Sequence, residues 1–264
     1  MLTVRTVAEM RAWPRTGSVG LVPTMGAFHA GHLSLIDAAR RDNDHVVVWL
    51  FVNPSQFDEA ADLTAYPRDE ASDARLAAEH GADVLLAPAV EEVYPPGFAT
   101  QVSVPGLADT LEGAHRPGHF TGVATVVTKM LNLVRPDRAY FGAKDAQQVA
   151  LVRRLVADLD IDTEIVTLPI VREPDGLALS SRNVHLGPEE RSRAAAISRA
   201  LRSAPRDGAE RHVRDALREA GIEPEYVAVV DPDTFLAPAN GRALIAVAAR
   251  VGTTRLIDNV EVPG

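Results

Sequence analysis

Cysteine is absent from the 264-residue sequence, which excludes disulfide bonds, thiolate metal sites and cysteine nucleophiles. Any bound metal ion must therefore take oxygen or imidazole ligands. Long apolar runs are also missing, because no stretch approaches the roughly 18 apolar residues that a membrane span needs, and the first residues lack the apolar core of a signal peptide. We therefore expect a cytoplasmic protein with no membrane partner.

Basic charge is scarce as well. The chain has 27 Lys and Arg against 36 Asp and Glu, which gives a net charge of −9. Nucleic-acid-binding proteins usually present a basic surface, so this balance argues against a nucleic-acid partner. An acidic chain can still hold a local cationic pocket, and an anionic substrate would need one. The length fits one large domain or two smaller ones.

The order of segments predicts an α/β fold. Short apolar, β-branched runs alternate with longer segments in which apolar residues recur at three- and four-residue intervals. This alternation is typical of a doubly wound parallel sheet with crossover helices. The predicted strands lie near residues 18–24, 45–52, 83–87, 137–141 and 162–168, and the predicted helices at 32–41, 69–81, 120–134 and 146–159.

The pattern changes after about residue 170. Helices are expected within 180–204 and 209–220, followed by a strand at 225–231 and a hairpin that bends around Gly252. A small α+β second domain is the simplest account. We therefore predict domains at residues 1–170 and 171–264.

The stretch "MGAFHAGH", residues 25–32, follows the first predicted strand. If Thr24 closes that strand and Leu33 opens the helix, His29 and His32 lie at the first helical turn. A helix start attracts anions, and imidazole donors there would stabilise charge on a transferring phosphoryl group. We interpret the pair as a nucleotidyl clamp. The alternatives are a simple helix cap and a zinc site, although helical metal pairs normally lie four apart with a third ligand nearby.

Two further segments follow predicted strands. In "FVNPSQF", Gln56 offers an amide that can donate and accept, which suits a substrate with hydroxyl and carboxylate groups, although a plain turn would look similar. In "YFGAKDAQQV", Lys144 suits ATP phosphates and Asp145 suits a ribose hydroxyl or a magnesium-bound water. The alternative is a capping box between Asp145 and Gln148, with Lys144 solvated.

The stretch "VREPDGLALSSRN", residues 171–183, lies at the predicted domain boundary. Ser180 and Ser181 can donate to phosphate, and Arg182 adds a permanent charge with a forked set of donors. A helix N-cap would explain the serines but not the arginine. We therefore expect a loop that closes over ATP.

An H-x-G-H first turn with a later Ser/Arg loop resembles the HIGH-type nucleotidyl-transferase superfamily. More closely, the chain resembles the pantothenate synthetase (pantoate–β-alanine ligase) family through "VPTMGAFHAGH", "FVNPSQF", "YPRD", "RPGHFTGVATVVTKMLNLVRPDRAYFGAKDAQQV" and "VREPDGLALSSRN". The resemblance covers most of residues 18–186, and the last 75 or so residues add little. It implies a Rossmann-like domain with a C-terminal lid, a homodimer, and an ATP- and Mg²⁺-dependent ligase of pantothenate biosynthesis. That ligase joins pantoate to β-alanine through a pantoyl adenylate.

The resemblance also implies residue roles. ATP binding falls to Met25, Gly26, Ala27, Phe28, His29, Ala30, Gly31, His32, Gly142, Ala143, Lys144, Asp145, Val171, Leu179, Ser180, Ser181 and Arg182. Catalysis falls to His29, His32, Lys144, Ser180, Ser181 and Arg182, with His32 as proton donor. Gln56 would bind pantoate and β-alanine, Gln148 would bind pantoate, and Asp73 would be the metal-side aspartate. Leu179, Ala143 and Ala146 depart from the family's usual methionine, glutamate and tyrosine.

Two other functions compete with this one. Another adenylyltransferase of the superfamily would act on a phosphate ester, but a second phosphate would call for arginines where the chain has Gln56 and Gln148. A non-catalytic nucleotide-binding protein would have no need of the histidines, the lysine and the arginine together. The roles of Arg116 and His119 stay open.

Overall fold

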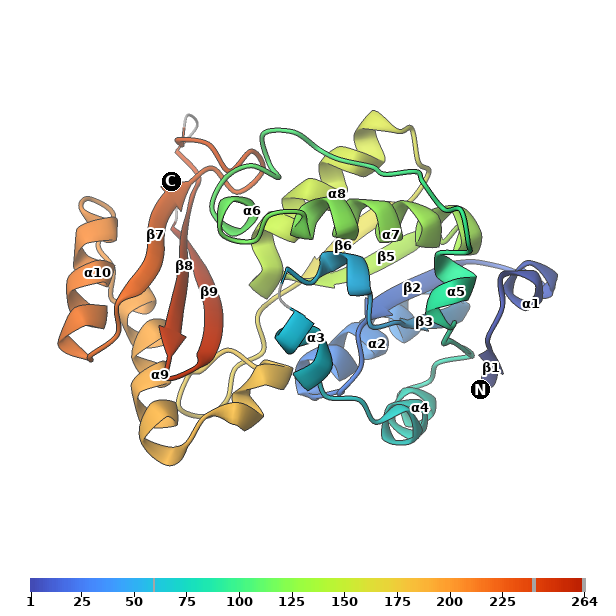
Figure 1. Ribbon diagram of the computed structural model, residues 1–264, viewed down its shortest axis with the longest axis horizontal. Helices are drawn as coiled ribbons and strands as arrows, with labels where there is room; N and C mark the ends of the chain where they lie inside the picture. Colours follow the sequence, from blue (N-terminus) through green and yellow to red (C-terminus); the bar gives the residue numbers. More distant parts are fainter. Residues whose placement is uncertain (59, 239–240, 263–264) are drawn as a thin grey trace. The chain divides into compact units, whose positions relative to one another are not determined.

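The computed structural model describes residues 1–58, 60–238 and 241–262 (Figure 1). The chain divides into two compact units. The first unit is Met1–Gly142 with Leu151–Leu168, and the second is Ala143–Ala150 with the chain from Pro169 onward. Within the described ranges, no helix is both long enough and apolar enough to cross a membrane.

The first unit is built on a parallel six-stranded sheet in the order β1-β4-β3-β2-β5-β6. Its strands are β1 (Leu2–Val4), β2 (Val19–Thr24), β3 (His45–Leu50), β4 (Val84–Leu86), β5 (Arg138–Gly142) and β6 (Glu164–Leu168). The five predicted strands and the doubly wound α/β class are confirmed. The short edge strand β1 was not predicted, because three residues are too few to show a periodicity.

Helices cover both faces of this sheet. The helices in this part of the chain are α1 (Val7–Ala12), α2 (Ala30–Asp42), the 3-10 helix η1 (Pro54–Gln56), α3 (Ala60–Ala65), α4 (Glu70–Glu79), α5 (Val90–Val93), α6 (Glu112–His115), α7 (His119–Val134) and α8 (Ala146–Asp158), whose first residues belong to the second unit. Helices α2 and α4 share a core with alternate strand residues such as Val48 and Leu85. The next residues, Trp49 and Leu86, face the opposite side, where α1 and α7 contact each other.

The strand order reverses between β2 and β5, which pair through Gly20 with Arg138 and Leu21 with Ala139. From β2 the chain moves to β3 and β4 on one side, whereas β6 lies on the other side of β5. Open α/β sheets bind their ligands outside the carboxyl ends of the strands at such a reversal. The segment after Thr24 and the end of β5 at Gly142 both lie there.

The second unit is built on the antiparallel sheet β7-β8-β9. Its elements are the 3-10 helices η2 (Ala143–Asp145) and η3 (Ser181–His185), the helices α9 (Pro188–Arg202) and α10 (Ala209–Glu219), and the strands β7 (Pro224–Val230), β8 (Ala243–Val251) and β9 (Thr254–Val262). Helices α9 and α10 bury Ile197 and Leu217 against Ile245 and Val247. The predicted helices and the hairpin at Gly252 are confirmed.

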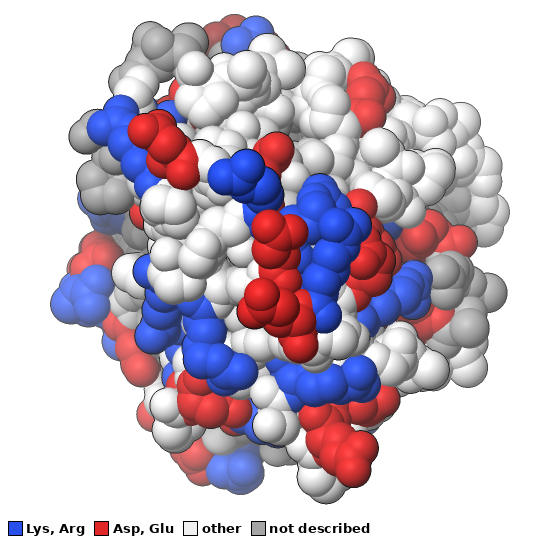
Figure 2. Space-filling model, turned by 90° about the vertical axis from the view of Figure 1, so that its left-hand side faces the viewer, with Lys and Arg blue, Asp and Glu red and all other residues white. Residues whose placement is uncertain are grey.

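Charged side chains of both signs are interleaved on the face that Figure 2 shows. Ion pairs of the second unit include Arg191 with Glu173 and Arg218 with Glu223. Exposed pairs of this kind contribute little to stability. They do neutralise many of the arginines locally.

Candidate active site

Helix α2 begins at Ala30, with His29 as its N-cap. The expectation that Leu33 opens this helix is wrong by three residues, because the two histidines themselves form the cap. Gly31 N–H donates to His29 Nδ1 at 3.1 Å, and His29 N–H donates to His32 Nδ1 at 3.4 Å. The cap alternative and the clamp are therefore compatible, since the same side chains serve as the cap.

This cap decides how the imidazoles carry their protons. The rings of His29 and His32 stack with centroids 4.1 Å apart. Each Nδ1 accepts a backbone N–H and is therefore unprotonated, so the neutral ring carries its proton on Nε2. Both histidines can thus donate from Nε2 without being charged. Within the described residues no group of three His, Asp or Glu could hold a metal ion, so the zinc alternative has no third ligand there.

Asp73, in the first turns of α4, fixes the segment that leads into this cap. Its carboxylate accepts the N–H groups of Ala27 at 2.9 Å and Phe28 at 2.8 Å. Gly26 and Ala27 both have positive φ, +91° and +53°, and a Cβ on Gly26 would lie 2.8 Å from Asp73 Oδ2. Burial raises the pKa of Asp73, and the two backbone hydrogen bonds oppose that rise. Both oxygens serve the backbone, so the Mg²⁺ assignment stays a prediction.

Gln56, at the end of η1, contacts the same segment. Its Nε2 lies 3.0 Å from Met25 Sδ, and its Oε1 accepts from Asn53 Nδ2 at 3.1 Å. Asn53 is 1% exposed and also donates to the carbonyl of Gly122 in α7. Tyr94 O–H donates to Asn53 Oδ1 at 2.8 Å. Burial raises the pKa of the Tyr94 hydroxyl, which keeps it protonated as that donor.

His119 and Arg116 hold the backbone of Gln56. His119 Nδ1–H donates to the Gln56 carbonyl at 2.7 Å, and Arg116 approaches the same oxygen at 3.4 Å. Arg116 also lies 3.2 Å from His119 Nε2 and pairs with Asp58 at 3.4 Å. Both residues therefore contact the backbone of Gln56, whichever part they have in binding a substrate.

In the second unit, Lys144 is held from strand β9. Asn259 Nδ2 donates to the carbonyls of Ala143 and Lys144, both at 2.9 Å. The Lys144 side chain is 20% exposed, and its Nζ lies 3.7 Å from Asp145 Oδ2. Lys144 is thus partly buried, whereas the capping-box alternative left it solvated.

The loop before the two serines is anchored at several points. Arg172 forms a two-pronged pair with Asp258 of β9, at 2.6 and 2.9 Å, and Asp258 is 4% exposed. Glu173 pairs with Arg191 of α9. Leu179 N–H donates to the Val171 carbonyl at 3.0 Å, and Ser180 Oγ accepts from Arg182 N–H as the cap of η3.

The predicted residues thus form two groups. In the first unit, the segment from Met25 to His32 lies with Gln56 and Asp73, and Gly142 ends β5. In the second unit, η2 and η3 both contact β9, while Gln148 lies at the start of α8. The sequence did not point to Asn53, Tyr94, Arg172, Asp258 and Asn259. Only the polar pair Asp258-Asn259 inside the apolar run "RLIDNV" carried a readable signal.

Comparisons with known proteins agree along the whole chain. The pantoate-beta-alanine ligase family model matches residues 2–261, well beyond the 18–186 of the motif resemblance. A pantothenate synthetase of Roseiflexus castenholzii is 51% identical over an alignment 275 positions long, which covers 98% of this chain and 98% of the relative. A Thermus thermophilus pantothenate synthetase structure covers 100% of both chains at 51% identity with a TM-score of 0.94.

A pantoate-beta-alanine ligase of Francisella tularensis is 35% identical, with a TM-score of 0.87, and covers 98% of this chain and 97% of its own. That structure is a complex with beta-gamma ATP and beta-alanine. The last 75 residues lie almost wholly inside the family match, so the expectation that they add little is wrong. The chain belongs to the pantoate–β-alanine ligase family.

Proposed function

We propose that this protein condenses pantoate with β-alanine at the expense of ATP, through an enzyme-bound pantoyl adenylate, and releases pantothenate, AMP and pyrophosphate. Family membership supports this reaction, and a relative has been observed with beta-gamma ATP and beta-alanine. The observation that carries it is the pair of Nε2–H donors that the cap of α2 fixes at one helix start.

In the first step a pantoate carboxylate oxygen attacks the α-phosphorus of ATP, and the bond to pyrophosphate breaks. Charge builds on the phosphate oxygens, and donors already in place stabilise it without reorganising. We assign His29 and His32 to this task, with His32 as proton donor, and the backbone of residues 25–31 to ATP. A neutral ring can donate a hydrogen bond from Nε2–H to a phosphate oxygen, whereas transfer of a proton from His32 would require its imidazolium form.

In the second step the β-alanine amine attacks the acyl carbon of the mixed anhydride, and AMP leaves. A mixed anhydride hydrolyses in water, so the site must shield it. Gln56 is assigned to pantoate and β-alanine, and Gln148 to pantoate. The Asn53 and His119 contacts, which hold both ends of Gln56, support a fixed orientation for its amide.

The second unit supplies the remaining assignments. Gly142, Ala143, Lys144 and Asp145 are assigned to ATP, Val171 to the adenine, and Leu179 with Ser180, Ser181 and Arg182 to the phosphates. We also propose that residues 171–264 act as a lid. The separate core of this unit and the anchored loop at 172–173 support that role.

Mg²⁺ would screen the phosphate charge when bound, but no step here passes through it. The carboxylate nearest the expected place, Asp73, already accepts two N–H groups. The expectations of Mg²⁺ and a homodimer rest on the family resemblance, and the expectation of a cytoplasmic location rests on the lack of long apolar runs; all three stay predictions.

The deciding experiment is pyrophosphate release in a single turnover. We expect pyrophosphate release to require pantoate but not β-alanine. Pantothenate should then form when β-alanine is added. Release only with a phosphate ester would favour another adenylyltransferase. An active relative serves as control. If the protein binds ATP but releases no pyrophosphate with any carboxylic acid, it is a nucleotide-binding protein and the ligase is excluded.

A further inference from the structure

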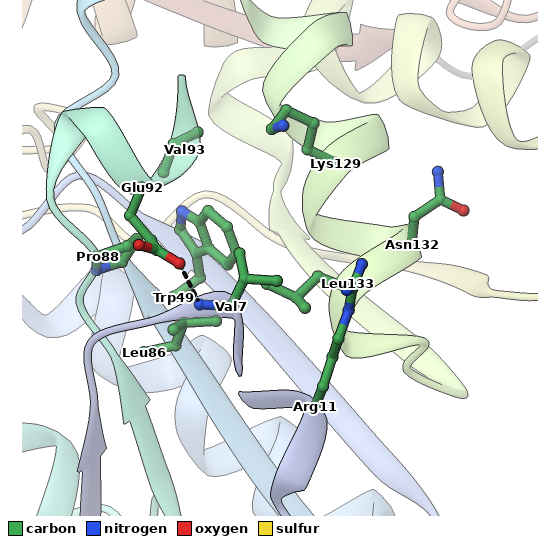
Figure 3. A pocket seen from close by; sticks show the side chains of 10 residues that line it. All are labelled: Val7, Arg11, Trp49, Leu86, Pro88, Glu92, Val93, Lys129, Asn132 and Leu133. Atoms are coloured by element: carbon green, nitrogen blue, oxygen red, sulfur yellow. Dashed lines mark hydrogen bonds between the residues drawn. The ribbon is translucent and has the colours of Figure 1, made fainter. Parts of the chain in front are cut away.

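A cavity in the first unit lies on the face of the sheet that α1 and α7 cover, and it has a volume of about 260 Å³ (Figure 3). None of the predicted site residues lines it. Its walls come from α1, β3, the end of β4, α5 and α7. The lining residues are Val7, Arg11, Trp49, Leu86, Pro88, Glu92, Val93, Lys129, Asn132 and Leu133.

Trp49 gives this cavity a hydrogen-bond donor. Its side chain is 4% exposed, and no acceptor in residues 1–58, 60–238 or 241–262 pairs with the indole Nε1–H. The indole nitrogen is not one of the fully buried unpaired side-chain atoms of the described residues, so its N–H is accessible to a ligand. Figure 3 shows the indole among the lining side chains, with its nitrogen toward α5. A ligand atom in the cavity would supply the missing acceptor.

The cavity is lined by more positive than negative side chains. Neither Arg11 nor Lys129 has a carboxylate partner among the described residues, and Lys129 Nζ lies 4.7 Å from the ring centroid of Phe98. Glu92 is the acidic group of the lining, and its Oε1 already accepts from Val7 N–H at 2.7 Å. Figure 3 shows Glu92 on one side of the cavity and Arg11 on the other. A carboxylate would therefore be attracted to the Arg11 side and repelled from the Glu92 side.

We propose that this cavity binds a small hydroxycarboxylic acid with an apolar body. Its carboxylate pairs with Arg11 and Lys129, since charge-assisted hydrogen bonds are the strong ones. Its hydroxyl accepts a hydrogen bond from Trp49 Nε1–H and donates one to the Glu92 carboxylate. A hydroxyl is suited to this end of the cavity because it can do both. Its body packs on the apolar walls. The volume lies below that of pockets for drug-sized molecules, which calls for a ligand of roughly ten heavy atoms.

Trp49 itself provides the readout, because the chain has only two tryptophans. A ¹⁵N-tryptophan-labelled protein shows two indole N–H signals, and Trp13→Phe assigns the one from Trp49. The probe is para-hydroxybenzoate, with benzoate lacking the hydroxyl and para-hydroxybenzamide lacking the charge. The expected result is a saturable shift of the Trp49 signal with Kd of roughly 1 mM for the full probe, and binding about tenfold weaker for each analogue.

Variants test the charge assignment. Arg11→Gln and Lys129→Gln should each weaken binding about tenfold, while Arg41→Gln, in the last turn of α2 and outside the lining, should leave it unchanged. A Trp49 signal that stays still at about 50 mM probe, or that moves equally with all three compounds, overturns the proposal. A signal that follows protein concentration instead shows that a second copy covers the cavity, and overturns it too. No activity is measured, so failure here leaves the proposed ligase reaction untouched.

Discussion

Asp73→Asn tests whether a buried carboxylate shapes the segment before the histidine cap. Asparagine keeps the shape but has one acceptor oxygen, so its NH₂ would face one of the two N–H groups that now donate at 2.9 and 2.8 Å. One hydrogen bond to a charged group contributes about 1.5–3 kcal/mol, and removing a desolvated charge offsets part of that loss. We expect the free energy of unfolding to fall by about 1–2 kcal/mol, which lowers Tm by about 2–8 °C in a chain of this size.

The same substitution should slow adenylation. His29 follows the two anchored N–H groups directly, and a displacement of about 1 Å in a catalytic group can cost up to about 100-fold in rate. Single-turnover pyrophosphate release and thermal unfolding measure the two effects. Asp44→Asn is the matched control, because Asp44 accepts Ser18 N–H at 2.8 Å at the amino end of the sheet, and it should leave the release rate unchanged. Wild-type Tm and wild-type rate in Asp73→Asn would refute the reasoning.

The pH dependence of this difference tests the effect of burial. Asparagine does not titrate, so the stability difference between wild type and variant isolates Asp73. Burial raises its folded-state pKa above the unfolded value of about 3.9. The folded state therefore holds the proton more tightly, and this contribution is complete below about pH 3.9 and is lost as pH rises through the raised pKa. We expect the wild-type advantage to shrink over that window in urea titrations. An advantage that grows with pH would show that hydrogen bonding outweighs burial.

Three further predictions concern the other anchors. His29→Asn and His32→Gln keep the cap of α2, because Asn is a good N-cap and Gln fits the third position, so Tm should hold while single-turnover adenylation falls about 10²–10³-fold. Asn259→Asp should cost more stability in urea unfolding than Asn259→Ala, because a carboxylate would face two carbonyl oxygens. Gly122→Ala would place a Cβ 2.2 Å from the Ser55 carbonyl, so it should lower Tm by displacing η1 and raise the KM for pantoate; an unchanged KM would contradict this.

The sequence was sufficient for the architecture because hydrophobic periodicity is a local signal. Five parallel strands and their helices each showed it over several residues, and so did the hairpin at Gly252. Strand β1 is too short to do so. The start of α2 was misplaced for another reason, since histidine is not a residue that usually marks an N-cap. Here two side chains capped the helix while also serving as candidate site residues.

The candidate site was predictable only where its residues are close together in sequence. His29 and His32, Lys144 and Asp145, or Ser180 to Arg182 could be recognised as motifs. Their anchors could not, because contacts such as Asp73 with Ala27 or Asn259 with Lys144 join positions 46 and 115 residues apart. No periodicity or spacing rule relates such positions, so the hydrogen bonds from Ala27 and Phe28 to Asp73 could not be predicted from the sequence.

Residues that hold the site through long-range hydrogen bonds should respond to mutation differently from the imidazoles that they position. Asp73, Asn53 and Asn259 are each at most 7% exposed, and each satisfies backbone or amide groups of a segment that carries candidate site residues. A functional group whose segment is held by such hydrogen bonds keeps its geometry only while those hydrogen bonds are intact. Loss of an anchor should therefore reduce stability and rate together, because it leaves buried groups unpaired. Loss of the imidazoles alone, with the cap preserved, should reduce the rate while the fold persists.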